Sequence, residues 1–142
     1  MIVYLDTSAL VPLVIEAQSS EACRRLWDEA DDVVSSRLGY VEAAAALAQA
    51  RRLERLTPRQ QSSALRALDD HWSQMQIAEI DQPLVERAAK LAQDFAMRGY
   101  DAVHAASAEF VNGDSVVAGS GDRHLLEAWR RPGINTYDTS AS

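Results

Sequence analysis

The chain has 142 residues, enough for a single domain spanning residues 1–142, and its 21 acidic and 14 basic side chains give a formal net charge of −7. The charge argues against a broadly basic nucleic-acid-binding surface, and the lone cysteine, Cys23, excludes an internal disulfide or a cysteine-based metal site. No apolar run approaches the roughly 20 residues of a membrane helix, and no basic segment precedes the first apolar residues. We therefore predict a cytoplasmic protein.

Short apolar runs, typical of strands buried on both faces, alternate with segments typical of helices. We predict strands over residues 2–5, 33–34, 75–80, 115–118 and 134–137. We predict helices over residues 7–12, 21–30, 37–56, 58–72, 82–97, 101–111 and 122–129. This alternation predicts an α/β fold in which helices cover both faces of a mostly parallel sheet.

Cap and turn residues mark the ends of several predicted elements. Ser35 or Ser36 is expected to cap the helix over 37–56, and Thr57-Pro58 supplies the cap and first residue of the next helix. Asn112-Gly113 is expected to close the helix over 101–111. Gly119-Ser120-Gly121 is expected to form a tight bend after the fourth strand.

Four carboxylates occupy positions that a parallel sheet brings to one edge. Asp6 follows the first strand, Glu42 lies early in the helix after the second, Asp101 begins a helix, and Asp122 follows the fourth strand. Gathered carboxylates repel one another unless a cation neutralises them, and oxygen ligands without cysteine favour Mg²⁺ or Mn²⁺. Such a site suits metal-assisted hydrolysis of a phosphodiester.

Polar residues near these acids have supporting or structural interpretations. We expect Ser8 and Ser120 to orient carboxylates rather than to attack a substrate. Taken singly, Asp101 and Asp122 are equally well explained as helix N-caps, because Asp is a favoured cap. His104 lies three residues after Asp101, and we interpret it as a structural, hydrogen-bonding histidine rather than a metal ligand.

The segments DTSAL, YVEAAAAL, YDAVHAA and SGDRHLL resemble, in this order, the motifs of PIN-domain ribonucleases, and specifically those of VapC toxins from bacterial toxin-antitoxin pairs. The resemblance covers nearly the whole chain and implies a PIN-like three-layer α/β/α sandwich. It implies one or two Mg²⁺ or Mn²⁺ ions bound by the four carboxylates, with the two serines in support.

The same resemblance implies endonucleolytic cleavage of structured RNA, such as tRNA or ribosomal RNA, and arrest of translation. It also implies a VapB-type antitoxin and a homodimer that enters a larger toxin-antitoxin assembly. An acidic toxin suits a basic antitoxin, and surplus apolar residues over 37–72 suit either the dimer or the antitoxin. A basic cluster is either an RNA contact or an ordinary solvated helix end; it consists of Arg51, Arg52, Arg55 and Arg59.

Two rival interpretations use the same acids. A phospho-receiver signalling domain places acids at strand ends, but it needs paired acids after the first strand and a lysine at a late strand end. Asp6 has no acidic neighbour, and Lys90, the only lysine, lies within a predicted helix. A catalytically inactive PIN-like binding module would keep the fold without needing the acids, whereas all four are present.

Overall fold

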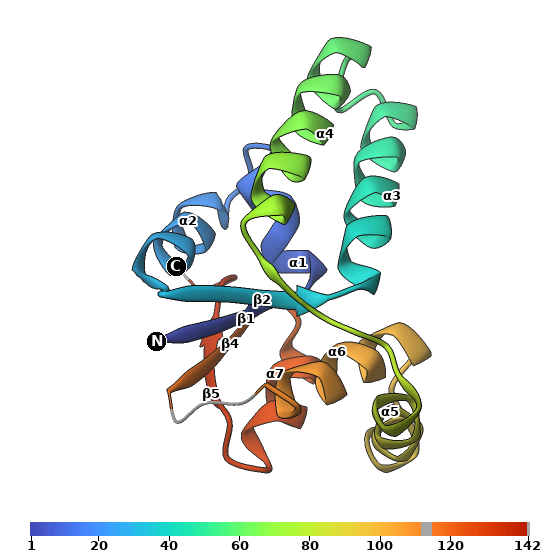
Figure 1. Ribbon diagram of the computed structural model, residues 1–142. Helices are drawn as coiled ribbons and strands as arrows, with labels where there is room; N and C mark the ends of the chain where they lie inside the picture. Colours follow the sequence, from blue (N-terminus) through green and yellow to red (C-terminus); the bar gives the residue numbers. More distant parts are fainter. Residues whose placement is uncertain (112–114, 142) are drawn as a thin grey trace.

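The sheet at the centre of the molecule has five strands, and its strand pairings are parallel (Figure 1). The computed structural model describes residues 1–111 and 115–141. The strands lie in the order β3-β2-β1-β4-β5. Their bounds are β1 (Ile2–Leu5), β2 (Asp32–Ser36), β3 (Gln76–Ala78), β4 (Val116–Ser120) and β5 (Asn135–Asp138). The predicted α/β fold around a parallel sheet is confirmed.

Helices cover both faces of this sheet and complete the three layers (Figure 1). One face carries α1 (Thr7–Leu10), a 3₁₀ turn (Val11–Leu13), α2 (Ser20–Glu29), α3 (Leu38–Arg52) and α4 (Pro58–Ser73). The opposite face carries α5 (Gln82–Phe95), α6 (Gly99–Glu109) and α7 (Arg123–Arg130). The predicted α/β/α sandwich is therefore present.

The side chains of β1 alternate between two hydrophobic cores, as a strand covered on both faces requires. Val3 and Leu5 belong to the core beneath α1 and α2. Tyr4 belongs to the core on the α5, α6 and α7 side, where it packs edge to face against Trp129. Asp6 follows with extended backbone, so the alternation places its side chain on the same side as Tyr4.

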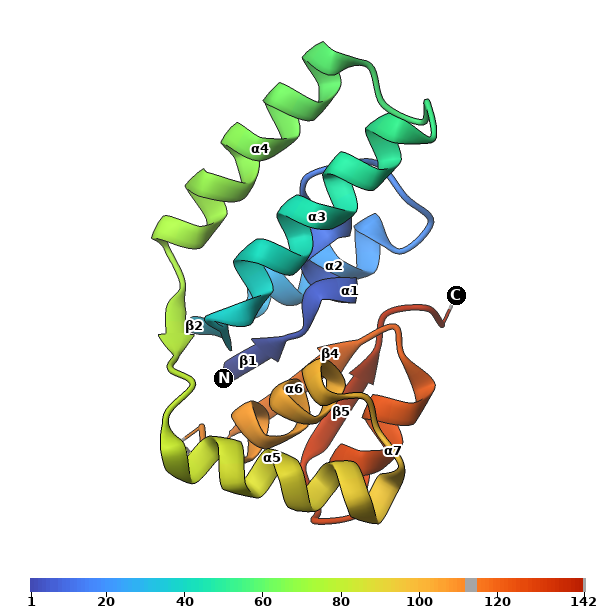
Figure 2. The same cartoon turned by 90° about the vertical axis from the view of Figure 1, so that its right-hand side faces the viewer.

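Helices α3 and α4 form a hairpin that extends away from the sheet (Figure 2). α3 ends at Arg52, earlier than predicted. α4 begins with a capping box: the Thr57 hydroxyl accepts from the Gln60 amide, and the Gln60 side chain accepts from the Thr57 amide. Val41 and Leu53 on this hairpin are 58% and 54% exposed. The hairpin therefore presents apolar side chains to the outside.

Strand β2 is longer than its apolar residues suggested. It includes Ser35 and Ser36, which were predicted as helix caps. The Ser35 hydroxyl instead donates to the Leu5 carbonyl at 2.6 Å, whereas the Ser36 hydroxyl still accepts from the Leu38 amide at 3.1 Å. The sequence predicted Ser35 or Ser36 as the cap of the helix that follows. Arg37 occupies the N-cap position of α3 instead, without a capping side chain. Ser36 still binds the first helical amide, whereas the Ser35 hydroxyl has its partner on the neighbouring strand.

Strand β4 also continues farther than predicted, through Gly119 and Ser120. A Cβ at Gly119 would lie 2.8 Å from Leu26 Cδ1 and 3.1 Å from Leu5 Cδ2. The glycine thus allows α2 to pack closely against the strand and does not mark a bend. The expectation of a tight bend at Gly119-Ser120-Gly121 is wrong for its first two residues.

Two smaller differences concern element ends. α6 begins at Gly99, before Asp101, and β3 has three residues where the sequence predicted a strand over 75–80. The predicted helix end at Asn112-Gly113 lies outside the described residues. Neither difference changes the order of the elements.

The strand order distinguishes the rival fold interpretations. Phospho-receivers have the flavodoxin-like strand order 2-1-3-4-5, whereas this sheet has the order β3-β2-β1-β4-β5. The phospho-receiver alternative is therefore wrong.

Within residues 1–111 and 115–141, no helix combines the length and apolarity needed to cross a bilayer.

Candidate active site

The switch point of the sheet lies at β1, which has β2 on one side and β4 on the other. Open parallel sheets bind ligands beyond the carboxyl ends of their strands at such a point. Asp6 directly follows β1, and Asp122 follows β4. Glu42 lies early in α3 and Asp101 lies in the first turn of α6. Asp6 and Asp122 therefore stand at the switch point itself.

Asp6 is a buried carboxylate, with only 6% of its surface exposed. The Ser8 hydroxyl donates to its Oδ1 at 2.7 Å, and the Ser120 hydroxyl donates to its Oδ2 at 3.0 Å. Burial raises the pKa of Asp6 above its usual value, and the charge of Asp122 adds to this, while His104 and the two hydroxyls oppose it. A cation beside Asp6 would offset the desolvation of its charge.

The two serines connect Asp6 to the loop that follows β4. Ser8 Oγ accepts from the Gly121 amide at 2.9 Å, and Ser120 Oγ accepts from the Asp122 amide at 2.9 Å. The two hydroxyl oxygens lie 3.3 Å apart. Ser8 and Ser120 were expected to orient carboxylates, and the structure places both hydroxyls on Asp6.

Glu42 accepts two hydrogen bonds on one carboxylate oxygen. Thr7 Oγ1 donates to its Oε1 at 2.7 Å, and His104 Nε2 lies 2.6 Å from the same oxygen. Partial burial favours the neutral acid, but the hydrogen bonds from His104 and from the Thr7 hydroxyl lower the pKa of Glu42 below its usual value. Glu42 is therefore held ionised and in a fixed orientation.

Asp122 and Asp101 differ in their local roles. Asp122 Oδ1 accepts from the amides of His124 and Leu125 at 2.9 and 3.3 Å, so Asp122 is the N-cap of α7. Asp101 is not the N-cap of α6; its Oδ2 accepts from Arg98 Nε at 3.3 Å. In the described part of the chain, neither residue hydrogen-bonds another of the four carboxylates.

The donor types at the switch point fit a hard divalent cation. They are carboxylate and hydroxyl oxygens, the ligands that Mg²⁺ and Mn²⁺ prefer. Among the described residues, no three His, Cys, Asp or Glu side chains converge closely enough to hold an ion. Mg²⁺ keeps several waters and commonly takes only one or two protein carboxylates, so the residues present suit such an ion without a preformed cage.

The sequence interpretation missed part of this network. Tyr4 was not considered, yet its hydroxyl lies 2.7 Å from His104 Nδ1. His104 was interpreted as a hydrogen-bonding structural histidine, but its partners Tyr4 and Glu42 were not identified. Two signals could have indicated them: Tyr4 stands two residues before Asp6 on one strand face, and a buried tyrosine hydroxyl usually has a hydrogen-bond partner.

The arginine cluster lies at the tip of the α3–α4 hairpin (Figure 2). Arg51 and Arg52 end α3, Arg55 lies in the connecting loop, and Arg59 lies in the first turn of α4, all of them exposed. At about 1.5 Å per residue, Arg51 lies about 14 Å beyond Glu42 along the helix axis. The structure therefore does not bring this cluster together with the carboxylates.

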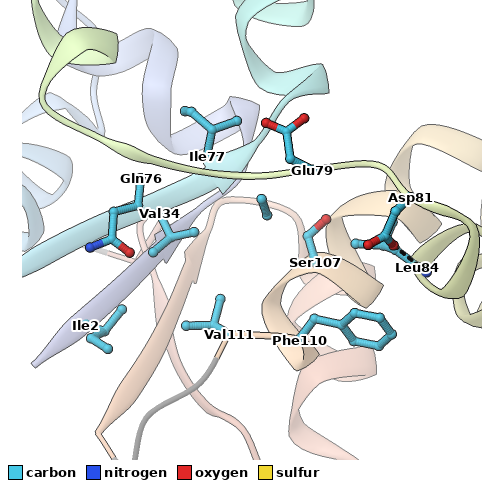
Figure 3. Close-up of a pocket in the computed structure, with 11 residues that line it drawn as sticks. Ile2, Val34, Gln76, Ile77, Glu79, Asp81, Leu84, Ser107, Phe110 and Val111 are labelled. Carbon is cyan, nitrogen blue, oxygen red and sulfur yellow. Dashed lines mark hydrogen bonds between the residues drawn. The ribbon is translucent and has the colours of Figure 1, made fainter.

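A separate cavity of about 370 Å³ lies beside β3 (Figure 3). Its described lining residues include Leu84 and Phe110 but none of the four carboxylates. Its two rim acids have structural partners, since Glu79 pairs with Arg37 and the Asp81 side chain accepts from the Leu84 amide. The two acids of this cavity are thus engaged in structural contacts, and the four candidate carboxylates lie elsewhere.

Comparison with known proteins identifies relatives over most of the chain. The family model of the PIN domain matches residues 3–129. Two ribonucleases of Mycobacterium tuberculosis, VapC45 and VapC49, are each 40% identical over 124 residues, which cover 87% of this chain and 86% of theirs.

Solved structures share the fold at lower identity. PAE2754 from Pyrobaculum aerophilum has a TM-score of 0.69 and 24% identity, covering 99% of this chain and 86% of its own. VapBC2 from Rickettsia felis, solved with a promoter DNA fragment, has a TM-score of 0.65 and 14% identity, covering 96% of this chain and 98% of its own. The family match and the 40% identity show that the chain belongs to the PIN-domain family, as a VapC-type member.

Proposed function

We propose that this protein, acting as a single domain in the cytoplasm, is a metal-dependent endoribonuclease and the toxin of a VapBC-type toxin-antitoxin pair. The proposal rests on one observation above all: Asp6 is a buried carboxylate at the switch point, and serine hydroxyls hold both of its oxygens. Family membership supports the reaction class, because the two M. tuberculosis relatives are ribonucleases.

The proposed substrate is structured RNA, such as tRNA or ribosomal RNA, and the proposed consequence is arrest of translation. Mg²⁺ or Mn²⁺ would supply phosphate neutralisation and a water of lowered pKa. The residues that would hold one or two such ions, together with bound water, are Asp6, Glu42, Asp101 and Asp122. The hydroxyls of Ser8 and Ser120 keep Asp6 in place. The lowered pKa of Glu42 keeps that group ionised at neutral pH.

Cleavage of RNA by the purified protein tests the proposal, with Mg²⁺, with Mn²⁺ and with EDTA. Asp6→Asn should lower the rate by more than about 100-fold, beyond the usual effect of losing a residue that merely orients a metal ligand. Asp94→Asn is the matched control, because Asp94 pairs with Lys90 on the surface of α5. Equal rates for the wild type and Asp6→Asn would contradict the proposal.

A growth assay distinguishes a catalytic toxin from a protein that acts only by binding. Induced expression of the wild-type chain should stop bacterial growth, whereas Asp6→Asn should not. An inactive binding module would act through its surface, so both proteins would then have the same effect on growth. That result, together with no cleavage in vitro, would favour the binding-module alternative.

The α3–α4 hairpin supports the second part of the proposal, a VapB-type antitoxin partner. A hollow of about 670 Å³ has Val11, Ile15, Ala46, Leu53 and Leu56 among its lining residues. Large exposed apolar patches mark protein interaction sites, and the net charge of −7 favours a basic partner. The similarity to the Rickettsia felis VapBC2 structure supports the same class of partner.

Co-expression tests this partner assignment. A short reading frame beside the gene of this protein should suppress growth arrest. Leu53→Asp should prevent this suppression while leaving RNA cleavage by the purified protein unchanged, because Leu53 lies at the hairpin and not at the switch point. Light scattering on the purified protein measures its molar mass and so tests the proposed homodimer.

A further inference from the structure

Tyr4 and His104 form a buried hydrogen-bond chain that ends on Glu42. The Tyr4 hydroxyl lies 2.7 Å from His104 Nδ1, and His104 Nε2 lies 2.6 Å from Glu42 Oε1. Tyr4 is fully buried and His104 is 2% exposed. His104 Nε2 also lies 3.4 Å from Thr7 Oγ1. Because water does not reach these groups freely, the imidazole nitrogens depend on these protein partners.

The chemistry of the partners sets the direction of this chain. Glu42 Oε1 already accepts from Thr7 Oγ1, and as an acceptor it pairs with a proton on His104 Nε2. The Tyr4 hydroxyl can then donate to Nδ1. We propose that Tyr4 and His104 are positioning residues: the Tyr4 hydroxyl holds the His104 ring in place through Nδ1, and the Nε2–H group of His104 orients Glu42 for the reaction. The inference rests on the proposed function.

The orientation of Glu42 has a chemical consequence. Thr7 and His104 both hydrogen-bond Oε1, and among the described residues no donor reaches Oε2. The Glu42 side chain is 22% exposed. Two donors on one oxygen therefore stop rotation of the carboxylate and leave the other oxygen to face a cation or a water.

Tyr4 is well placed to act as the fixed end of this chain. It lies on β1, whose two neighbours in the sheet are β2 and β4. Its ring packs edge to face against Trp129, with centroids 5.8 Å apart and planes at 77°. The rigid sheet thus fixes the position of the Tyr4 hydroxyl. Through its hydrogen bonds, His104 in turn restricts the orientation of the Glu42 carboxylate on α3.

The tautomer of His104 is measurable by ¹⁵N NMR on the metal-free protein, which has three histidines. His104→Gln removes one set of ring signals and so assigns them. We expect His104 in the wild type to have a protonated Nε2 and an unprotonated Nδ1, and Tyr4→Phe to shift the Nδ1 signal of His104, because that atom loses its hydrogen bond. His71 and His124 serve as internal references, because their ring nitrogens contact backbone carbonyls elsewhere.

Kinetics of RNA cleavage test the link to the reaction. Tyr4→Phe should lower kcat by about 10- to 100-fold with little change in KM, the range seen when a group that orients a metal ligand is lost. Tyr40→Phe is the matched control. It removes another tyrosine hydroxyl, one that donates to Asp69 on the α3–α4 hairpin, and it should change neither kcat nor the Nδ1 signal of His104.

Two substitutions of His104 separate positioning from packing. His104→Gln retains an N–H donor near the position of Nε2 and should keep more activity than His104→Leu, which fills similar space without a donor. Thermal unfolding measures the stability of both variants. If both are folded and equally stable, a difference in kcat reports the hydrogen bond to Glu42.

Three results would overturn the inference: an unchanged Nδ1 signal of His104 in Tyr4→Phe, an unprotonated Nε2 in the wild type, or equal kcat for folded His104→Gln and His104→Leu. The NMR experiment needs neither metal nor RNA. A wild-type protein that fails to cleave RNA would therefore refute the proposed function, whereas the NMR result would be obtained independently.

Discussion

Ser120 Oγ donates a hydrogen bond to Asp6 Oδ2 at 3.0 Å, although 114 positions separate the two residues in the chain. Ser120 Oγ also accepts a hydrogen bond from the Asp122 amide at 2.9 Å. One buried hydroxyl thus joins the end of β1 to the loop after β4. Removing the Ser120 hydroxyl would leave Asp6 Oδ2 without this donor and the Asp122 amide without this acceptor.

The first prediction concerns this hydroxyl. Ser120→Ala should lower the free energy of unfolding by about 1–3 kcal/mol, because buried polar groups lose their hydrogen bonds. It should also lower the RNA cleavage rate about 10-fold or more. Ser120→Thr keeps the hydroxyl and serves as control. Urea unfolding and cleavage assays measure both effects, and equal behaviour of the two variants would contradict the assigned role.

The second prediction is a pH dependence of stability in the metal-free protein. Burial raises the pKa of Asp6 in the folded state, so between the unfolded and folded pKa values the folded chain binds more protons than the unfolded chain. The contribution of Asp6 to the free energy of unfolding therefore falls as pH rises through this window.

Asp6→Asn isolates this contribution because the substitution removes only the titrating group. Relative to the wild type, Asp6→Asn should gain stability as pH rises from the acidic range to neutrality. Urea unfolding at a series of pH values measures the difference. If the difference in the free energy of unfolding between the wild type and Asp6→Asn stays constant with pH, Asp6 does not titrate with a raised pKa.

The third prediction concerns close packing between α2 and β4. Gly119→Ala should lower the free energy of unfolding by about 1–3 kcal/mol, because the added Cβ overlaps Leu26 and Leu5. Gly99→Ala is the control, since a Cβ there meets nothing within 4 Å. Equal stability of the two variants would mean that the α2–β4 contact can relax without cost.

The fourth prediction decides between the two interpretations of the arginine cluster. If it contacts RNA, replacing its members with Gln should reduce the salt dependence of RNA binding by roughly 0.7–0.9 in log-log slope for each contact; the members are Arg51, Arg52, Arg55 and Arg59. Arg24→Gln is the control, because Arg24 pairs with Glu16 on the surface. A solvated helix end would leave the slope unchanged.

The fold was predictable because strand and helix patterns alternate along the whole chain, and only a parallel sheet accommodates that alternation. Strand ends were less predictable. Ser35, Gly119 and Ser120 have low intrinsic strand preference, and their place in β2 and β4 depends on neighbouring strands and on α2. Such long-range pairing leaves no signal within a short window of sequence.

The site was predictable where a residue directly follows a strand and less so where helices meet. The positions of Asp6 and Asp122 follow from strand order alone. The contact between His104 and Glu42 depends on how α6 and α3 are oriented around the sheet, which no local pattern encodes. The sequence therefore indicated a hydrogen-bonding role for His104 but not that its partner is Glu42.

The position of β4 beside β1 also has a consequence during synthesis. Asp6 is made before its partner on β4, which follows 114 positions later; at about 5–20 residues per second, about 6–23 s of translation separate them. A nascent chain lacking β4 has an incomplete centre of the sheet, and non-local parallel pairing forms slowly. The proposed cleavage of RNA therefore has to wait until β4 has been made, because Asp6 lacks the Ser120 hydroxyl before then.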